Sequence, residues 1–276
     1  MTIQDRDQLR TAVRERYGQA ATAAGEGCSA TDPATAFGSQ LYADGELAVL
    51  PDAAVAASLG CGNPTALADL RPGQVVLDLG SGGGIDVLLS ARRVAPGGKA
   101  YGLDMTPEMH TLATKNQAEA GVTNAEFLLG TIEAIPLPDA SVDVIISNCV
   151  VNLSPDKPQV LREAFRVLRP GGRLAISDMV LARVLPAHLA GLVGLWTGCV
   201  AGAHVKAELE AQLADAGFVE ISVTPVRVFD RAELAELARG MDPGQVPADL
   251  DVEATLDALD GVITSSFIRA SKALGA

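Results

Sequence analysis

Four cysteines carry the most specific chemistry that this chain could perform: Cys28, Cys61, Cys149 and Cys199. The last three are separated by 88 and 50 positions, whereas compact metal-binding motifs place cysteines two to four residues apart. They can form one site only if the fold gathers them. Thiolates are preferred ligands of soft ions, so gathered cysteines would make a soft trithiolate pocket.

Each cysteine also has a simpler explanation. Cys61 could be a small residue in the turn formed with Gly62–Pro64, and Cys199 could fill a space where a larger side chain would clash. Cys149 follows a predicted strand, and a buried cysteine there is more often an inert part of the core than a ligand.

Zinc is the main alternative occupant of a thiolate cluster. It usually takes four ligands, so the fourth would have to be Cys28 or a histidine. The chain has three histidines, His110, His188 and His204, and none shows a spacing relation to the cysteines.

Composition narrows the functional class. Of the 276 residues 48% are apolar, which excludes a disordered chain, and 21 basic against 34 acidic residues give a net charge of −13. That charge repels nucleic acid and anionic membranes and suits a neutral or cationic small substrate. The N-terminus lacks an apolar signal region, and residues 189–203 are too short to span a bilayer. We therefore expect a cytoplasmic protein, in which sparse cysteines are more often free thiols, ligands or catalytic groups than structural disulfides.

The pattern of elements from residue 74 onward alternates between strands and helices, which predicts an α/β fold with a doubly wound, parallel sheet. A helix over 5–24 precedes it, followed by a strand-and-turn or frayed helix over 47–57 and a helix over 65–70. The expected strands are 74–79, 99–104, 125–129, 142–147, 173–179, 221–229 and 262–272, and the expected helices are 85–94, 107–120, 157–168, 204–216 and 232–238.

A glycine turn joins the first of these strands to its helix. Gly80, Gly82 and Gly84 alternate with other residues there, and Asp78 precedes them on the strand. Such glycines let a backbone approach a ligand closely at a helix N-terminus. The turn alone is a weak signal, but Asp104 ends the second strand, where an acid can hold a ribose. A nicotinamide dinucleotide site would share the acid but has the glycine spacing G-x-G-x-x-G.

Together with residues 101–105 and 168–174, this turn resembles class I S-adenosylmethionine-dependent methyltransferases. The resemblance covers about residues 69–179 and the C-terminal strands. It implies a seven-stranded, mostly parallel sheet with the last strand antiparallel, and S-adenosyl-L-methionine as the cofactor. The cofactor-binding residues it implies are Asp78, Gly80, Ser81, Gly82, Gly84, Asp104, Met105, Thr131, Ile132, Glu133 and Asn148.

The resemblance also implies how these residues divide the cofactor between them. Asp104 would bind the ribose hydroxyls, Met105 would flank the adenine, and residues 131–133 would surround the base. Asp78 and the glycines would contact the methionine part. Ordinary loop and helix-cap chemistry is an equal alternative for Thr131 and Glu133.

Three longer blocks, Leu59–Pro64, Ile146–Lys157 and Leu195–Ala203, resemble arsenite methyltransferases. The family likeness implies that Cys61, Cys149 and Cys199 bind As(III). A fourth cysteine in the N-terminal arm of that family can pair with the first of these, and Cys28 takes its place here. Many bacterial members carry adjacent cysteines at this point, whereas Cys28 lies between Gly27 and Ser29. This departure leaves open whether Cys28 acts as a relay or in a disulfide.

The chemistry of arsenic fits the composition. Arsenous acid is neutral near pH 7, three thiols can displace its hydroxyls, and its lone pair can attack an activated methyl carbon without a general base. The absence of a histidine–carboxylate pair in the sequence agrees with such a reaction. We expect As(III) or a thiol conjugate such as its glutathione complex as substrate, with thioredoxin or glutathione as reductant, and neither nucleic acid nor membrane as partner.

The resemblance also suggests a division of the chain. Residues 1–45 would form an N-terminal helix and loop, 46–182 the cofactor-binding domain, and 183–276 the segment that completes the arsenic site, with the closing strands. Two alternatives stay open: a methyltransferase for an ordinary oxygen, nitrogen or carbon nucleophile with structural cysteines, and a metalloid-binding protein whose cofactor domain is degenerate.

Overall fold

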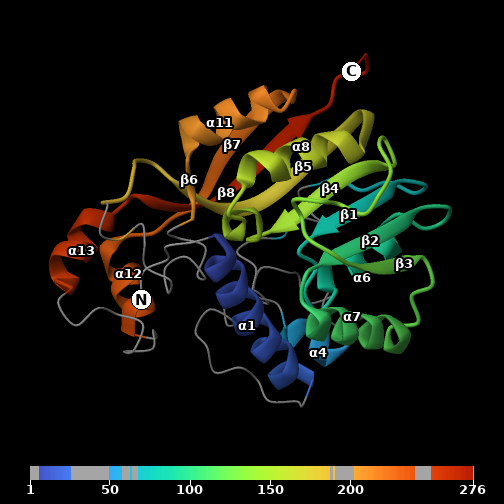
Figure 1. Ribbon diagram of the computed structural model, residues 1–276, viewed down its shortest axis with the longest axis horizontal. Helices are drawn as coiled ribbons and strands as arrows, with labels where there is room; N and C mark the ends of the chain where they lie inside the picture. The colour runs from blue at the N-terminus through green and yellow to red at the C-terminus, as the bar shows by residue number, and fades with distance from the viewer. Residues whose placement is uncertain are drawn as a thin grey trace.

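The computed structural model describes residues 6–25, 50–57, 63, 68–186, 189, 202–239 and 250–275. Its centre is one twisted sheet in the order β3-β2-β1-β4-β5-β8-β7, with the short β6 paired to β5 (Figure 1). The strands are β1 (Val75–Leu79), β2 (Lys99–Asp104), β3 (Ala125–Leu129), β4 (Val142–Asn148), β5 (Leu168–Leu181), β6 (His204–Val205), β7 (Val219–Val228) and β8 (Ile263–Ser271).

Helices cover both faces of the sheet, as the alternating pattern predicts. α8 and α11 lie over one face, while α6 and α7 lie over the other (Figure 1). The described helices are α1 (Arg6–Gly25), α4 (Asp52–Ala56), α6 (Ile85–Arg93), α7 (Pro107–Glu119), η1 (Val151–Leu153), α8 (Lys157–Val167), α11 (Lys206–Asp215), α12 (Arg231–Arg239) and α13 (Val252–Leu259).

The strand directions confirm the doubly wound, class I arrangement. The pairs β1–β2, β1–β4, β2–β3 and β4–β5 are parallel, and β8 runs antiparallel between β5 and β7. Seven strands form the main order, and β6 adds a two-residue eighth. The chain goes from β1 outward to β3 and then returns to β4 on the other side of β1. At such a reversal the carboxyl ends of neighbouring strands open into a crevice.

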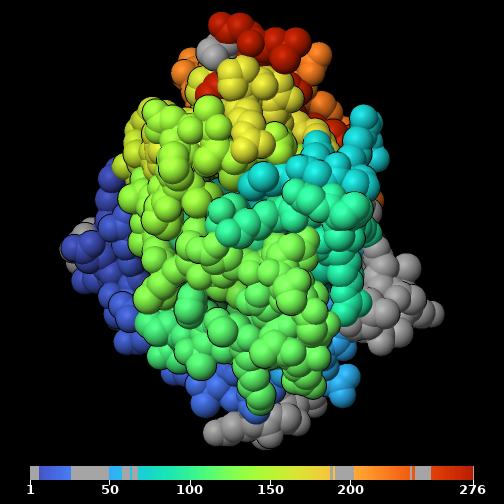
Figure 2. All heavy atoms as spheres, turned by 90° about the vertical axis from the view of Figure 1, so that its right-hand side faces the viewer, coloured from blue at the N-terminus to red at the C-terminus, as the bar shows by residue number. Residues whose placement is uncertain are grey.

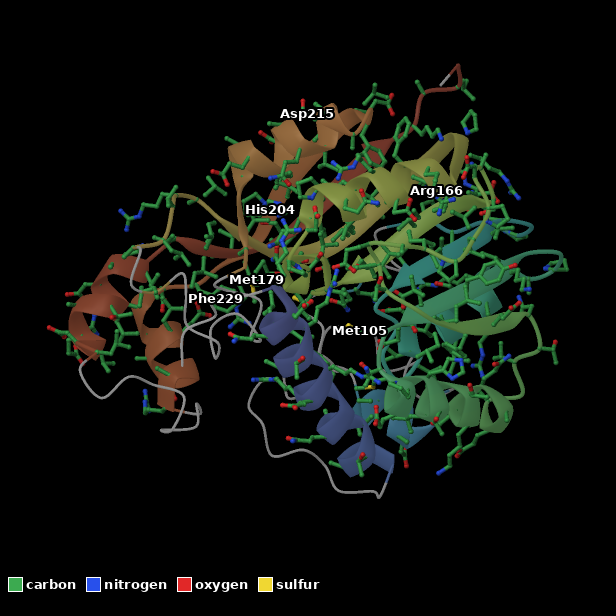
Figure 3. All side chains as sticks on the ribbon, in the orientation of Figure 1. Met105, Arg166, Met179, His204, Asp215 and Phe229 are labelled. Atoms are coloured by element: carbon green, nitrogen blue, oxygen red, sulfur yellow. The ribbon has the colours of Figure 1, made fainter. Side chains whose placement is uncertain are left out.

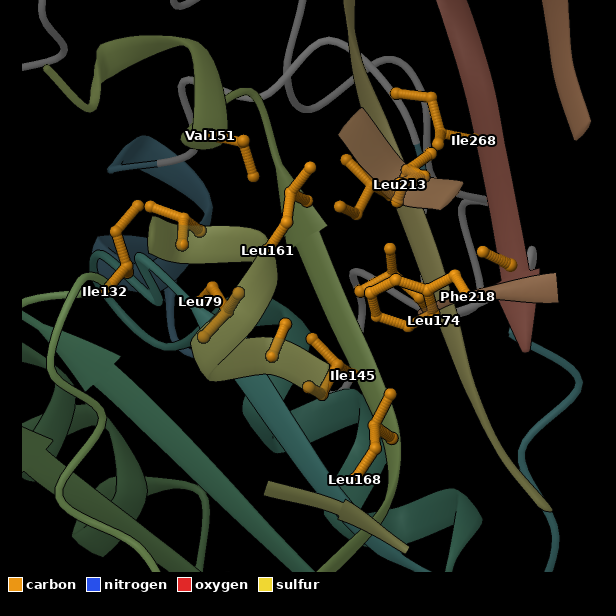
Figure 4. Packing of buried hydrophobic residues seen from close by; sticks show 14 of the residues in the cluster. Leu79, Ile132, Ile145, Val151, Leu161, Leu168, Leu174, Leu213, Phe218 and Ile268 are labelled. Carbon is orange, nitrogen blue, oxygen red and sulfur yellow. The ribbon is translucent and has the colours of Figure 1, made fainter. Parts of the chain in front are cut away.

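The core forms because the central strands are apolar on both faces. Four of the five residues of β1 are buried, and so are five of the seven of β4, as is typical of parallel strands covered on both sides. On the α8 and α11 side, Leu79 and Ile145 of the sheet belong to the same buried cluster as Leu161 and Leu213 of the helices (Figure 4). This core fixes the carboxyl ends of β1 and β4 next to each other.

The structure differs from the sequence prediction at the start of β5 and at residues 204–205. β5 begins at Leu168 instead of residue 173, because the Pro170–Gly172 turn forms an irregularity inside the strand, where its register with β4 shifts. His204 and Val205 pair with β5 instead of beginning a helix, which starts at Lys206. The segment over 47–57 contains the helix α4, while the helix expected at 65–70 lies mostly outside the described residues.

Two further elements carry no prediction from the sequence. The short helix η1 follows Cys149, and α13 precedes β8. Arg231 at the start of α12 forms an ion pair with Asp257 of α13, and both helices share a separate apolar cluster with Phe229 and Ile263. Within the described ranges, no helix is long and apolar enough to cross a membrane.

The N-terminal helix α1 packs over the carboxyl ends of the strands (Figure 1). Leu9 and Val13 on its inner face are 2% and 3% exposed and belong to one cluster with Cys149 and Leu153. Burying such a side chain contributes about 1.5–3 kcal/mol. Figure 2 shows the molecule from the side on which the sheet ends in β3, with the blue helix α1 along one side of the view.

Candidate active site

One pocket opens at the carboxyl ends of β1, β2 and β4 and spans about 980 Å³, including the part of its mouth that is open to solvent. It lies at the crevice that the reversed strand order creates. Ten of the residues singled out by the sequence line it: Asp78, Gly80, Ser81, Gly82, Asp104, Met105, Ile132, Glu133, Asn148 and Cys149. Among the cofactor residues expected, Gly84 and Thr131 do not line it.

The three glycines of the turn differ in what a side chain at each position would meet. Gly80 has a φ of +73°, and a Cβ there would lie 2.4 Å from both Cγ atoms of Val150. Gly82, with a φ of +51°, faces open space, since its nearest contact would be the Met109 sulfur at 3.9 Å. A Cβ at Gly84 would lie 2.7 Å from the Phe127 ring. Gly84 therefore lets α6 pack against β3, and Gly80 lets the segment after β4 approach the turn.

Asp104 is an ordered acceptor at the end of β2. Its Oδ2 accepts a hydrogen bond from the Gly82 backbone N–H (2.9 Å), and its Oδ1 accepts one from the Thr106 N–H (2.9 Å). Burial raises the pKa of this carboxyl, and the two hydrogen bonds oppose that rise. Each carboxylate oxygen has a second lone pair, so Asp104 can still accept from a ligand hydroxyl.

Asp78 lies deeper in the same pocket. It is 2% exposed, and within the part of the chain that the structure describes its Oδ1 has no hydrogen-bond partner. Burial raises the pKa of the Asp78 carboxyl well above its usual range, and the charges of Asp86 and Asp104 raise it further. A buried oxygen without a donor, in a pocket with other carboxylates, fits a cationic ligand group such as an ammonium.

Asp86 is a pocket residue that the sequence reasoning missed. It is the second residue of α6, is 3% exposed, and accepts a hydrogen bond from the Asn148 side-chain amide (3.4 Å). Asn148 is the last residue of β4 and precedes Cys149, so this contact joins the helix that follows the glycine turn to the segment that carries the cysteine. An acid two residues after the last turn glycine was a readable signal.

Cys149 comes directly after β4, in the wall of the pocket. Its backbone N–H donates to the Ser177 carbonyl (2.8 Å), its φ is +58°, and it is 5% exposed. The sequence favours free thiols, but Cys149 is joined in a disulfide bond.

Cys28, Cys61 and Cys199, and with them the predicted As(III) ligand set and the predicted pairing of Cys28 with Cys61, lie outside the described residues. Among the residues that the structure does describe, no three His, Cys, Asp or Glu side chains are grouped so that they could hold a metal ion.

The helix α1 supplies part of the pocket that the sequence did not predict. Arg10, Val13 and Tyr17 line it. The Arg10 guanidinium lies 3.7 Å from the Glu133 carboxylate, which also accepts a hydrogen bond from the Ser154 hydroxyl (2.6 Å). Figure 3 shows Met105 and Met179 beside this helix, in agreement with their shared cluster. The amphipathic pattern of residues 5–24 indicated a buried face but not what it covers.

Comparison with known proteins agrees with this geometry. Residues 70–217 match a family model described as a methyltransferase domain. The chain is 41% identical over 272 residues to an arsenite methyltransferase of Halobacterium salinarum, covering 93% of this chain and 68% of that protein. It is also 41% identical over 177 residues to an arsenite methyltransferase of Aquipseudomonas alcaligenes, of whose length it covers 51%.

A solved structure supports the same assignment. An arsenic (III) S-adenosylmethionine methyltransferase from Chlamydomonas reinhardtii aligns with a TM-score of 0.61 and 29% sequence identity. The alignment covers 88% of this chain and 74% of that one. The chain therefore belongs to the arsenite methyltransferase family and is an S-adenosylmethionine-dependent methyltransferase.

Proposed function

We propose that this enzyme methylates As(III), which cysteine thiolates present to the cofactor pocket. The observation that carries the proposal is the position of Cys149 in the wall of the pocket that Asp78, Asp104 and the glycine turn line. The relatives from Halobacterium salinarum and Aquipseudomonas alcaligenes are arsenite methyltransferases, which agrees with it.

The described residues fit S-adenosylmethionine. Asp78 and Asp86 would receive its ammonium group, Asp104 its ribose hydroxyls, and Met105 and Ile132 would lie along the adenine. When bound, the cofactor supplies an electrophilic methyl carbon on a positively charged sulfur. The acidic lining of the pocket favours that cation over a neutral ligand.

Arsenic chemistry assigns the cysteines their role. We infer that Cys61, Cys149 and Cys199 displace the three hydroxyls of arsenous acid as water and leave the arsenic lone pair pointing at the methyl carbon. No base is needed, because arsenic has no proton to lose, and rate enhancement comes from holding the two atoms roughly 3–3.5 Å apart in line. The bond pair of the broken carbon–sulfur bond stays on the cofactor sulfur.

Electron balance explains why a reductant is needed. The arsenic lone pair becomes the new carbon–arsenic bond, so the metalloid is oxidised by two electrons. Two thiolates that leave together as a disulfide return these electrons, and an external thiol must then reduce that disulfide. Cys149 must be reduced before it can bind As(III), and we infer that thioredoxin or glutathione is the reductant, with Cys28 as the exchanging thiol.

The test is incubation of the reduced enzyme with As(III), a thiol and methyl-labelled cofactor, followed by separation of the arsenic species. We expect label in methylated arsenicals, and none with Cys149→Ser. Methyl transfer to another nucleophile that survives Cys149→Ser would show an ordinary methyltransferase instead. Binding of As(III) without turnover of any arsenical would show a metalloid-binding protein.

A further inference from the structure

Cys149 lies where the chain turns sharply out of the sheet. The last residue of β4, Asn148, is in register with Ser177 of β5, and the Cys149 N–H donates to the Ser177 carbonyl (2.8 Å). The chain then enters η1 with Cys149 at a φ of +58°. A non-glycine residue persists in this left-handed region only where its surroundings impose it. The direction of the Cys149 side chain therefore depends on what holds η1.

A buried pair of polar residues holds η1 to β5. The Asn152 amide nitrogen donates to Asp178 Oδ1 (2.8 Å) and to the Met179 carbonyl (2.7 Å), and its backbone N–H donates to Asp178 Oδ2 (3.3 Å). The Met179 N–H donates to Asp178 Oδ1 (2.8 Å). Asn152 and Asp178 are each 2% exposed.

These bonds are specific to a carboxylate at position 178. Two backbone N–H groups and one amide N–H converge on it, so both of its oxygens are acceptors, and an amide nitrogen in place of either oxygen would set a donor against a donor. The pair is also separate from the cofactor, since neither Asn152 nor Asp178 lines the cofactor pocket; both line a small cavity on the other side of η1, with Val151 and His204. The pair is connected to Cys149 along the chain, through Val150 and Val151, and through Ser177, which precedes Asp178 and accepts the hydrogen bond of the Cys149 N–H.

We propose that Asn152 and Asp178 are positioning residues, which fix η1 so that the Cys149 thiolate points into the arsenic site. The inference rests on the proposed function, because it gives the position of Cys149 a role in binding As(III). It assigns the two residues no contact with the cofactor or the metalloid. It also makes the geometry of Cys149 a property of the fold, independent of the disulfide that Cys149 forms in this structure.

The test variant is Asp178→Asn, which keeps the size of the side chain and replaces one acceptor oxygen by an amide donor facing other donors. Removing a partner that orients a ligand typically weakens metal binding by about 10- to 100-fold. We expect the KM for As(III) to rise by that factor and the KM for S-adenosylmethionine to change by less than about threefold, a split that general damage to the fold does not produce. Assays at pH 8 in excess thiol keep Cys149 reduced, and lie above the pKa of Asp178, which burial raises to about 7.

Thr264→Val is the matched control. Thr264 is also buried, and its hydroxyl donates to the Val180 carbonyl of β5 (2.9 Å), two residues beyond Asp178. Its loss removes two buried hydrogen bonds, the one to β5 and the one with the Ser266 hydroxyl (2.8 Å), and leaves the bonds between η1 and Asp178 in place, so both KM values should stay near wild type. If Asp178→Asn is not recovered folded, Asn152→Ser removes both side-chain amide bonds from the other partner and gives the same comparison.

Equilibrium dialysis of the reduced proteins against sodium arsenite separates this inference from the proposed function. If Cys149→Ser retains As(III) binding, the proposed thiolate site is wrong. If Cys149→Ser loses As(III) but Asp178→Asn and Asn152→Ser bind it with wild-type affinity and KM, the cysteine is a ligand and the positioning role is refuted. Weakened arsenite binding with unchanged cofactor affinity in these two variants supports the inference.

Discussion

Replacing Gly80 by alanine tests the contact between the cofactor turn and the segment that carries Cys149. Gly80 has a φ of +73°, and a Cβ there would lie 2.4 Å from both Cγ atoms of Val150 and 2.8 Å from its Cβ. Val150 follows Cys149 directly and lines the same pocket. The alanine methyl must therefore push Val150 away, or the turn must move.

The expected cost has two parts. Placing an L-residue in the left-handed region costs roughly 1–2 kcal/mol, and forcing an extra methyl into a well-packed region typically costs about 1–3 kcal/mol. Gly80→Ala should therefore lower the free energy of unfolding by roughly 2–5 kcal/mol, a large part of the ~5–15 kcal/mol that stabilises a typical protein. Cofactor affinity should fall as well, because the turn lines the pocket.

Two further variants separate these parts. Gly73 has a φ of +86° and nothing within 4 Å of the added Cβ, so Gly73→Ala measures the backbone term alone, about 1–2 kcal/mol. Adding Val150→Ala to Gly80→Ala removes the two Cγ atoms but leaves the close Cβ, so stability should recover only in part.

The measurements are urea unfolding of the reduced, cofactor-free proteins and calorimetric titration with S-adenosylmethionine. The coupling between positions 80 and 150 follows from the double-mutant cycle. If Gly80→Ala costs no more than Gly73→Ala, and Val150→Ala does not change its effect, then the turn and the Cys149 segment are not in tight contact, and the reasoning is refuted.

Three other predictions follow from the described contacts. Asp104→Asn places an amide against the Gly82 or Thr106 N–H and should weaken S-adenosylmethionine binding about 10-fold or more; an unchanged dissociation constant in calorimetry would show that Asp104 does not order the turn. Leu9→Ala removes a side chain that is 2% exposed and should cost about 2–5 kcal/mol in urea unfolding; a loss below 1 kcal/mol would mean that α1 is not docked. The pKa of His204 is lowered to about 4 by burial, so the neutral histidine contributes stability that is present above its unfolded pKa of about 6.5 and is lost as pH falls toward 4. The stability difference between wild type and His204→Gln should therefore grow by up to about 3 kcal/mol from pH 4 to 6.5; a difference that is flat with pH would show that His204 is not buried in its neutral form.

The pH dependence of Asp178 has the opposite sign. Burial raises the pKa of Asp178 to about 7, so between about pH 4 and 7 the folded protein holds a proton that the unfolded chain has lost. This carboxyl therefore makes the free energy of unfolding fall as pH rises through that window. Asp178 and His204 line the same small cavity, and below pH 6.5 their contributions offset each other.

Local periodicity and turn chemistry were enough to predict the central fold. The apolar runs at β1 and β4 and the glycine turn at Gly80–Gly84 lie in short, continuous stretches of sequence, and the structure confirms these strands and the doubly wound sheet. The turn at Pro170–Gly172 was harder, because proline and glycine usually end an element, whereas here the pairing with β4 continues past them. The sequence pattern predicts a helix at His204, because no local signal indicates that this residue pairs with the distant strand β5.

Some of the pocket residues can be predicted from the sequence and others cannot. Asp78, Asp104 and Cys149 lie at or directly after the carboxyl ends of strands that must meet, so topology alone predicts that they share a crevice. Arg10 and Tyr17 could not be assigned to it, because an amphipathic helix shows that one face is buried but not which surface covers it. The oxidation of Cys149 could not be predicted either, since disulfide partners far apart in sequence depend on the finished fold.

The segment after β4 is braced from both neighbouring strands, and the two braces should fail differently. On the β1 side, Val150 rests against Gly80, which also lines the cofactor pocket. On the β5 side, Asn152 is hydrogen-bonded to Asp178, and Asp178 does not line the cofactor pocket. A defect at Gly80 should therefore weaken both cofactor and As(III) binding, whereas a defect at Asp178 should weaken As(III) binding alone. Equal effects of both variants on the two ligands would mean that the cysteine and the cofactor turn move as one unit, and that the β5 contacts only stabilise the fold.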